Sequence, residues 1–164
     1  MGGLSQGRPK GSHRRRTARR SLSGTVRTNT ITKVLRSHEN RFTPETPLVL
    51  GGDFNVARDQ RDVAHPAAWE PTVLFHPTSR LALEELLNWG LVDVLQQQYP
   101  EGEVYSWWDY RNLAFAKNNG LRIDYIFATV PMGSACTDAE IDRQERKGLK
   151  PSDHAPVLAH FSGP

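Results

Sequence analysis

The chain has 164 residues, of which 37% are hydrophobic, and this length fits a single domain. One cysteine excludes an intramolecular disulfide, and no apolar run approaches the roughly 18 residues of a membrane span. Since no secretory signal follows the first methionine either, we expect a cytoplasmic protein. Residues 1–38 hold ten Lys or Arg and no acid, whereas residues 39–164 hold 11 bases and 18 acids, a net charge of −7. The basic pI therefore does not by itself indicate a nucleic-acid partner.

The first 30 residues are rich in Gly, Ser, Thr and Arg and have only scattered apolar residues. Such a segment cannot bury enough surface to offset the entropy lost on ordering, so residues 1–30 are predicted to be a disordered basic leader. A phosphate-binding arm or an organelle-targeting leader are alternatives to a leader without function. Residues 31–164 form the predicted domain, which starts with a short amphipathic helix over 31–38.

A short apolar strand at residues 47–50 precedes the most informative polar residues. We expect it to be buried on both faces and to be ended by Gly51 and Gly52. Asp53 and Asn55 follow, and in an extended chain both side chains would leave from one face. These two residues predict either a polar site at the end of a strand or an Asx-rich turn.

The remaining elements alternate between helical and strand patterns. Thr78 or Ser79 can cap a helix with apolar positions at 81, 83, 86 and 87, and Gly90 can end it. Three further segments resemble strands, at residues 105–111, 120–129 and 157–161. A charged loop is expected over 138–150. The order of elements predicts an α/β protein in which a sheet packs on helices.

Polar residues fall at strand ends or in loops at four places along the chain: Asp53 with Asn55, Trp107 to Arg111, Asp124, and Asp153 with His154. Each has a structural alternative. Asp124 could pair with Arg122 or Arg111, the tryptophans could be core residues, and Asp153 with His154 could form a turn.

Taken together, the four groups indicate metal-assisted hydrolysis of a phosphate ester. Asp and Asn oxygens are ligands suited to Mg²⁺, which adds phosphate oxygens to its shell. Converging carboxylates repel one another unless a cation or a protonated His lies between them. One Asp that orients a His and another that activates water form a general-base arrangement. The sequence has no Cys/His spacing for zinc, no Walker loop and no Gly-x-Ser-x-Gly elbow.

Four blocks of this sequence resemble the exonuclease III/AP endonuclease family of the endonuclease/exonuclease/phosphatase superfamily. They are Gly51-Gly52-Asp53-Phe54-Asn55, Ser106-Trp107-Trp108-Asp109-Tyr110-Arg111, Gly120-Leu121-Arg122-Ile123-Asp124-Tyr125 and Pro151-Ser152-Asp153-His154-Ala155-Pro156-Val157. The blocks stand in the family's order. The last block alone would indicate only the superfamily, whereas the second and third are typical of its DNA-repair branch.

The resemblance implies a catalytic role for four residues. Asp53 would activate or orient the attacking water, or protonate the leaving oxygen, and Asn55 would stabilise charge on the phosphate. Asp124 would hold His154, which would contact the scissile phosphate. Mg²⁺ or Mn²⁺ would be bound by Asp53, Asn55, Asp153 and His154.

The resemblance also implies contacts with DNA. Trp107 would lie beside an abasic sugar or a flanking base, and Arg111 would contact backbone phosphate. The implied partner is double-stranded DNA with abasic sites or 3′ ends, and the full domain would act as a monomer without a membrane. The implied activities are 3′→5′ exonuclease, 3′-phosphatase and abasic-site endonuclease. Another phosphoesterase of the superfamily, or a non-enzymatic DNA-binding remnant, remains an alternative.

The resemblance covers residues 33–161, which correspond to the carboxyl-terminal half of that family. The family fold is a four-layer, DNase I-like α/β sandwich, so we expect half of it here, with a mostly antiparallel mixed sheet and flanking helices. The family's amino half supplies a strand-borne Asn, a metal-binding Glu and a Tyr, and no counterparts are found here. We therefore expect a fragment with one sheet, a bare apolar inner face, a tendency to aggregate and weak or no activity.

Overall fold

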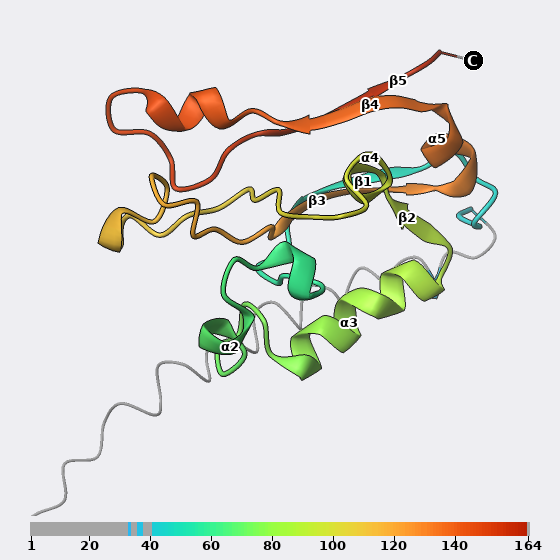
Figure 1. Ribbon diagram of the computed structural model, residues 1–164. Coiled ribbons are helices and arrows are strands. Elements are labelled where there is room, and N and C mark those ends of the chain that lie inside the picture. Colours follow the sequence, from blue (N-terminus) through green and yellow to red (C-terminus); the bar gives the residue numbers. More distant parts are fainter. Residues whose placement is uncertain (1–32, 34–35, 38–40, 164) are drawn as a thin grey trace, which may run out of the picture.

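The computed structural model describes residues 33, 36–37 and 41–163 (Figure 1). The leader expected over residues 1–30 lies outside the described residues, so its disorder stays a prediction. The strands are β1 (Val49–Asp53), β2 (Leu91–Asp93), β3 (Asp124–Thr129), β4 (Cys136–Ile141) and β5 (Val157–Phe161). The helices are α2 (Pro66–Trp69), α3 (Pro77–Asn88), α4 (Val94–Gln98) and α5 (Val130–Ala135), and the 3-10 turns are η1 (Gln60–Asp62), η2 (Arg111–Leu113) and η3 (Arg143–Lys147). Within this described part, no helix is long and apolar enough to cross a membrane.

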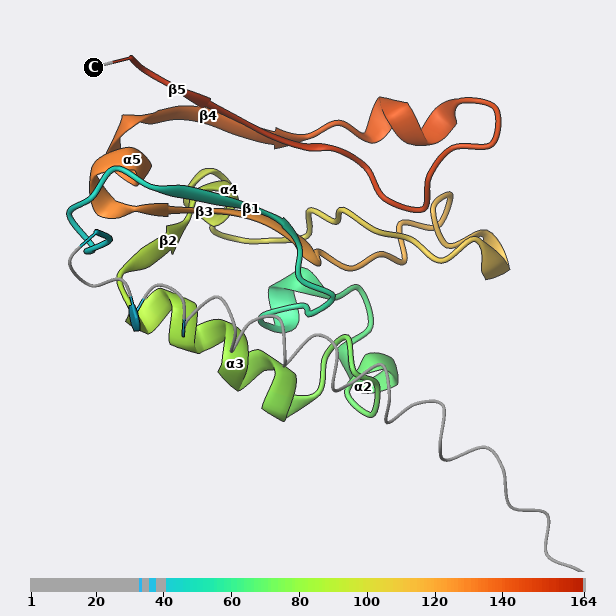
Figure 2. The ribbon, with the colours of Figure 1, turned by 180° about the vertical axis from the view of Figure 1, so that it is seen from behind.

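Two antiparallel sheets form the centre of the fold (Figures 1 and 2). The first has the strand order β1-β3-β2, and its register places Val49 opposite Ala128 and Asp53 opposite Asp124. The second consists of β4 paired with β5. The predicted α/β class with antiparallel pairing is therefore confirmed.

The β4–β5 pair lies over one face of the three-stranded sheet, and α3 lies on the opposite side (Figure 2). An apolar cluster fills the space between the two sheets, and it includes Ile126, Ala128, Ala139, Ile141, Val157, Ala159 and Phe161. The expectation of a single sheet is wrong, because β4 and β5 form a second sheet. This second sheet covers part of the face that was expected to be bare.

Strand β4 occupies part of the segment that was expected to be a charged loop. Its residues alternate between the two faces of the sheet, as a half-buried strand requires. Asp138 and Glu140 are exposed, whereas Ala139 between them is fully buried. The charged residues of this segment thus lie on the solvent face of a strand, and only residues from Asp142 onward form the turn that leads to η3.

Strand β1 is an edge strand, which corrects the prediction that it is buried on both faces. Among the described residues it pairs only with β3, and 40% of the surface of Val49 is exposed. The two glycines continue the strand, because Gly51 lies opposite Ile126 and Gly52 opposite Tyr125 in the ladder. The strand therefore ends at Asp53 and delivers that carboxylate at the edge of the sheet.

Helix α3 covers the other face of the three-stranded sheet. Leu83 and Leu86 are fully buried against a cluster that contains Phe54, Leu91, Tyr125 and Phe127. The helix begins two or three residues earlier than expected, since its N-cap is His76 in place of Thr78 or Ser79. His76 accepts a hydrogen bond from the backbone N–H of Thr78.

Gly90 ends α3 in the expected way. It follows the C-cap residue and has a φ of +118°, a left-handed conformation that disfavours a side chain.

Residues 105–111 were expected to form a strand, and the structure shows a largely irregular segment. Only single β-bridges occur there, from Trp107 to Leu121 and from Trp107 to His154. Because Trp107 pairs in both directions, it lies between the segment that leads into β3 and the segment that leads into β5. Likewise β3 starts at Asp124 instead of residue 120, since Leu121 makes bridges to Val63 and Trp107 and no continuous ladder.

A buried ionic group anchors the amino end of β3. The guanidinium of Arg122 lies 2.7 Å from Asp62 and 2.6 Å from Asp93, and at most 3% of each side chain is exposed. The same guanidinium stacks on the ring of Tyr125, 4.6 Å from its centroid. Arg122 is therefore fully engaged in the interior and does not pair with Asp124.

Candidate active site

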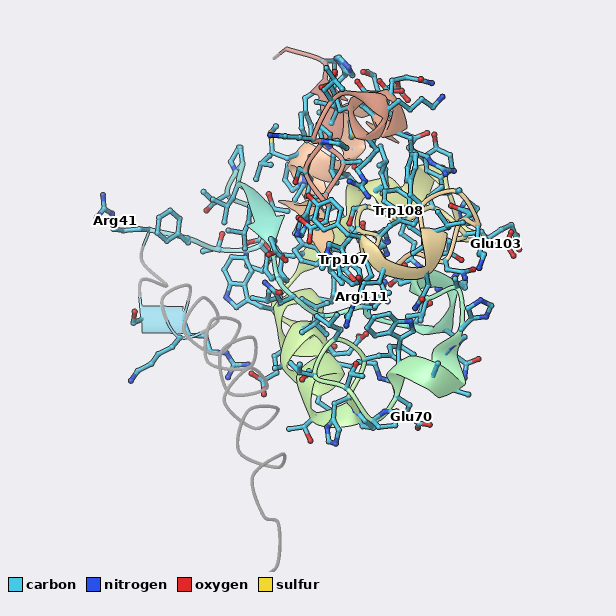
Figure 3. The ribbon with its side chains drawn as sticks, turned by 90° about the vertical axis from the view of Figure 1, so that its left-hand side faces the viewer. Arg41, Glu70, Glu103, Trp107, Trp108 and Arg111 are labelled. Atoms are coloured by element: carbon cyan, nitrogen blue, oxygen red, sulfur yellow. The ribbon has the colours of Figure 1, made fainter. Side chains whose placement is uncertain are left out.

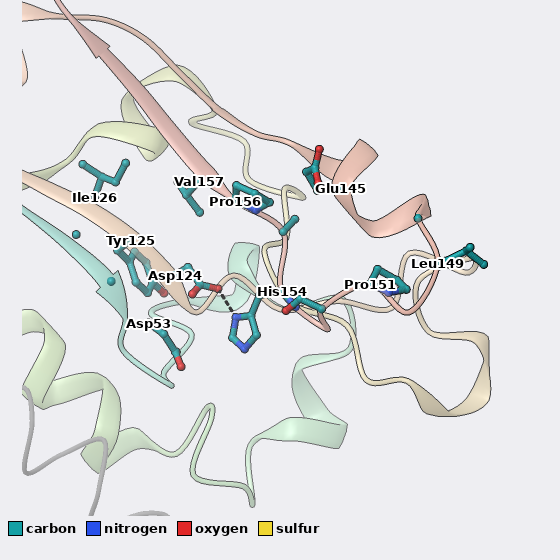
Figure 4. A pocket seen from close by; sticks show the side chains of 15 residues that line it. Asp53, Asp124, Tyr125, Ile126, Glu145, Leu149, Pro151, His154, Pro156 and Val157 are labelled. Atoms are coloured by element: carbon teal, nitrogen blue, oxygen red, sulfur yellow. Dashed lines mark hydrogen bonds and ion pairs between the residues drawn. The ribbon is translucent and has the colours of Figure 1, made fainter.

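Three of the predicted site residues converge at one edge of the two sheets (Figure 4). Asp53 ends β1, Asp124 begins β3 directly opposite it, and His154 precedes β5. One ligand atom from each of these residues lies within 4.8 Å of the others. Antiparallel pairing explains the convergence, because it brings the end of one strand beside the start of its neighbour.

The two alternatives for Asp53 and Asn55 are both present in the structure. The backbone N–H of Asn55 donates to Asp53 Oδ1 at 2.8 Å, which is an Asx turn, and Asn55 has a φ of 55°. The side-chain amide of Asn55 also donates to Asp53 Oδ2 at 2.6 Å. The chain turns instead of staying extended, and the turn holds both oxygens of the Asp53 carboxylate.

Asp124 and His154 form the second half of the site. His154 Nδ1 lies 2.9 Å from Asp124 Oδ2, with 32% and 17% of the two side chains exposed. Ser106, which was not predicted as a site residue, lies behind them with its Oγ 2.7 Å from the same Asp124 oxygen. Ser106 is the first residue of one of the quoted blocks, but a hydroxyl next to two tryptophans gives no sequence signal of its own.

Asp153 does not join this group. Its Oδ2 accepts a hydrogen bond from the indole Nε1 of Trp107 at 2.9 Å, and its backbone carbonyl accepts one from the N–H of Trp108 at 3.0 Å. The ring of Trp107 also meets the ring of Trp69 edge to face, with the centroids 5.7 Å apart. Trp107 is thus held from two sides while its side chain stays partly exposed.

Arg111 lies on the surface beyond the tryptophans. Its side chain is 82% exposed and pairs with Asp109 at 2.5 Å. Figure 3 shows this side of the molecule with Trp107, Trp108 and Arg111 labelled. Trp108, by contrast, is fully buried, so the two adjacent tryptophans differ: one is a core residue and the other is accessible.

A cleft of about 780 Å³ opens beside the converging residues (Figure 4). Its walls come from β1, β3 and the loop that leads into β5, and they include Asp53, Asp124, Ile126, Glu145, Leu149, Ser152, His154 and Val157. The cleft therefore presents the carboxylates and the imidazole at one end and apolar side chains farther along.

The environment shifts the pKa of two of these groups upward. Partial loss of water around Asp53 raises the pKa of its carboxyl, and the charge of Asp124 adds to the rise, while the bonds from Asn55 and the charge of His154 oppose it. The hydrogen bond to Asp124 raises the pKa of His154, and the charges of Asp124, Asp53 and Asp153 act in the same direction. Without a cation, these charges thus favour the protonated form of the imidazole.

The donor set fits a divalent cation. Two carboxylates and an imidazole within 4.8 Å suit a hard or borderline ion such as Mg²⁺ or Mn²⁺. A cation there would also relieve the repulsion between Asp53 and Asp124, which adds to the effect of burial on the pKa of Asp53. Of the residues expected to bind metal, the structure brings Asp53 and His154 together with Asp124, and Asn55 touches the group through Asp53.

Comparison with known proteins identifies relatives for most of the chain. The family model described as Endonuclease/Exonuclease/phosphatase family matches residues 16–154. Exodeoxyribonuclease III of Haemophilus influenzae is 32% identical over 130 residues, covering 75% of this chain and 49% of that protein. An exodeoxyribonuclease of Bacillus subtilis is 34% identical over 126 residues, covering 76% of this chain and 48% of that protein. The chain thus spans about half the length of the curated relatives it matches.

Solved structures give the same result for the fold. An AP endonuclease from Archaeoglobus fulgidus superposes with a TM-score of 0.81 and 32% identity, over 87% of this chain and 55% of that one. A 3′ phosphatase from Neisseria, solved with a product DNA hairpin, superposes with a TM-score of 0.77 and 37% identity, over 83% of this chain and 52% of that one. The described fold is therefore the DNase I-like α/β fold of these enzymes.

Proposed function

We propose that this chain, which belongs to the endonuclease/exonuclease/phosphatase family, carries the hydrolytic site of an exonuclease III-type DNA-repair phosphodiesterase. The observation that carries the proposal is the convergence of Asp53, Asp124 and His154 at the end of a cleft. A hydrogen-bonded carboxylate–imidazole pair beside a second carboxylate suits attack of water on a phosphate ester.

Asp53 is proposed to move the proton of the reaction. It takes a proton from the attacking water or gives one to the leaving oxygen, and its raised pKa suits either role. Asn55 holds both oxygens of this carboxylate and keeps one side-chain N–H for a phosphate oxygen.

His154 is proposed to bind the scissile phosphate. Asp124 occupies Nδ1 of the ring and raises its pKa, so Nε2 can donate a hydrogen bond to a developing negative charge. A divalent cation held by the carboxylates of Asp53 and Asp124 would supply further charge stabilisation on the phosphate. Asp153 would act by orienting Trp107 in addition to the metal role first expected of it.

The proposed substrate is double-stranded DNA with abasic sites or 3′ ends, acted on by a monomer in the cytoplasm. The partly exposed Trp107 would lie beside the abasic sugar or a flanking base, and Arg111 would contact a backbone phosphate. The relatives support this choice, since they include an exodeoxyribonuclease III and a 3′ phosphatase solved with DNA. Because the chain spans about half of the relatives' length, we expect its cleavage to be weak.

Cleavage of a duplex with a single abasic site tests the proposal. We expect cleavage that requires Mg²⁺ or Mn²⁺ and disappears in Asp53→Asn, while the folded state, followed by circular dichroism, is kept. Mn²⁺ titration provides a measurement that does not depend on turnover, and the affinity for Mn²⁺ should fall in Asp53→Asn and Asp124→Asn. Cleavage that persists in Asp53→Asn would contradict the proposal.

A substrate panel separates this function from its alternatives. Trp107→Ala should weaken cleavage of duplex DNA and spare hydrolysis of a soluble phosphodiester such as bis(p-nitrophenyl) phosphate. Equal losses on both would favour another phosphoesterase of the superfamily. DNA binding without any metal-dependent cleavage, steeply weakened by salt and lost on deletion of residues 1–30, would favour a non-enzymatic DNA-binding protein.

A further inference from the structure

Resting on the function proposed above, we propose that Ser106 is a positioning residue that fixes the Asp124 carboxylate for its role beside His154. Ser106 is fully buried, so its hydroxyl does not reach the cleft or a substrate. Its Oγ donates to Asp124 Oδ2 at 2.7 Å. The same oxygen of Asp124 meets His154 Nδ1 at 2.9 Å, so one carboxylate oxygen binds both residues.

The hydrogen-bonding capacity of Ser106 is completely used. Its Oγ accepts the backbone N–H groups of Ile123 and Asp124, each at 3.1 Å. A hydroxyl has one hydrogen and two lone pairs, so with both lone pairs occupied its hydrogen can only point at Asp124. The backbone N–H groups of Ile123 and Asp124 therefore fix the direction of the bond from Ser106 to Asp124, and the hydroxyl does not rotate freely.

Ser106 also links the segments that carry the site. Its N–H donates to the carbonyl of Leu121 at 3.0 Å, and its carbonyl accepts the N–H of Ala155 at 2.7 Å. Ala155 directly follows His154. Ser106 thus fixes the positions of three parts relative to one another: the Asp124 side chain, the start of β3 and the backbone next to His154. Residues that hydrogen-bond to metal ligands and catalytic groups commonly orient them in this way.

Three variants at this position separate the hydroxyl from packing. Ser106→Ala removes the hydroxyl, whereas Ser106→Thr keeps it and Ser106→Val has the volume of Thr without it. Ser79→Ala is a matched control, because Ser79 is also fully buried and its Oγ has no hydrogen-bond partner among the described residues. It lies in α3, away from the proposed machinery.

The kinetic measurement is single-turnover and steady-state cleavage of the abasic duplex with Mg²⁺. Loss of an orienting partner typically lowers activity by about 10- to 100-fold, and we expect a loss of this size in kcat for Ser106→Ala and Ser106→Val. KM for DNA should stay within about threefold, since no DNA contact is removed. Ser106→Thr should keep much more activity than Ser106→Val, and Ser79→Ala should behave as the wild type.

Absence of cleavage in the wild type would count against the proposed function alone. The role of Ser106 would then be tested by the affinity for Mn²⁺, measured by titration. Ser106→Val should then bind Mn²⁺ more weakly than Ser106→Thr, because Asp124 is no longer held. Equal kcat values and equal Mn²⁺ affinities for the Thr and Val variants would overturn the inference. So would a general loss of folding in both Ala and Val variants, since the hydroxyl would then serve stability as a whole.

Discussion

His154 Nδ1 lies 2.9 Å from Asp124 Oδ2, although 30 residues separate the two in the sequence. The bond raises the pKa of His154 above its ordinary value of 6.5. A raised folded-state pKa means that protonation favours the folded protein. The stabilisation from this pair is therefore fully present below pH 6.5 and is lost as the pH rises through the raised pKa of His154.

The pH dependence can be measured on the metal-free protein. Urea unfolding of the wild type and of Asp124→Asn between about pH 5 and about pH 8 should show a difference in unfolding free energy that shrinks as pH rises. Proton NMR of the His154 ring should give a lower pKa in Asp124→Asn than in the wild type. An unchanged pKa would contradict the role of Asp124.

Asn55→Ala should weaken the site more than the fold. Asn55 has a φ of 55°, and placing Ala there costs about 1 kcal/mol. The change also removes the amide that holds Asp53 Oδ2, so we expect about a tenfold loss of cleavage or of Mn²⁺ affinity. Asn112→Ala is the control, because Asn112 has a similar φ of 59° and is exposed. Equal loss of metal affinity in both variants would contradict the expectation.

Removal of Arg122 should destabilise the whole protein. Arg122→Met leaves the carboxylates of Asp62 and Asp93 buried without their cation, and breaking such a group costs about 3–5 kcal/mol. Arg111→Ala breaks an exposed, solvent-screened ion pair and should change the free energy of unfolding far less. Urea unfolding of both variants measures the difference, and similar midpoints would show that the buried group adds little.

Gly120→Ala should also destabilise the fold. A Cβ at this position would lie 2.5 Å from Trp108 Nε1 and 2.7 Å from Tyr105 Cβ, both in buried side chains. Overpacking of this kind costs about 1–3 kcal/mol. Gly163→Ala has open space around it and should change the melting temperature very little. A Gly120→Ala variant as stable as the wild type would mean that Trp108 can move aside.

Elements with strong periodicity could be predicted from the sequence. The spacing of the leucines and the position of Gly90 predict α3 with nearly its observed bounds. The alternation of apolar residues does the same for β5. Strand β4 was missed because its buried positions include a small alanine, Ala139, between two charged residues. The second sheet depends on that strand, so missing β4 also led to the expectation of a bare inner face.

The site could be predicted only in part, for a similar reason. Asp53, Asp124 and His154 stand next to recognisable strand or turn signals, and the structure brings them together. The partner of Asp153, in contrast, is the indole of Trp107, 46 residues away, and no local pattern encodes that bond.

The buried group at Arg122 shows the same limit, because its two acids lie 60 and 29 residues away in the sequence. Long-range polar pairs of this kind are set by topology.

The two carboxylates and the imidazole come from different sheets: Asp53 and Asp124 belong to the three-stranded one, and His154 leads into β5. A shear of one sheet over the other by a single residue would displace the imidazole by roughly 3.3 Å, more than the length of the bond it makes. The small side chains of Ala128, Ala139 and Ala159 at the interface set how closely the sheets approach. Enlarging one of these alanines would change the spacing of the two sheets. It would therefore affect the chemistry although no catalytic residue is substituted.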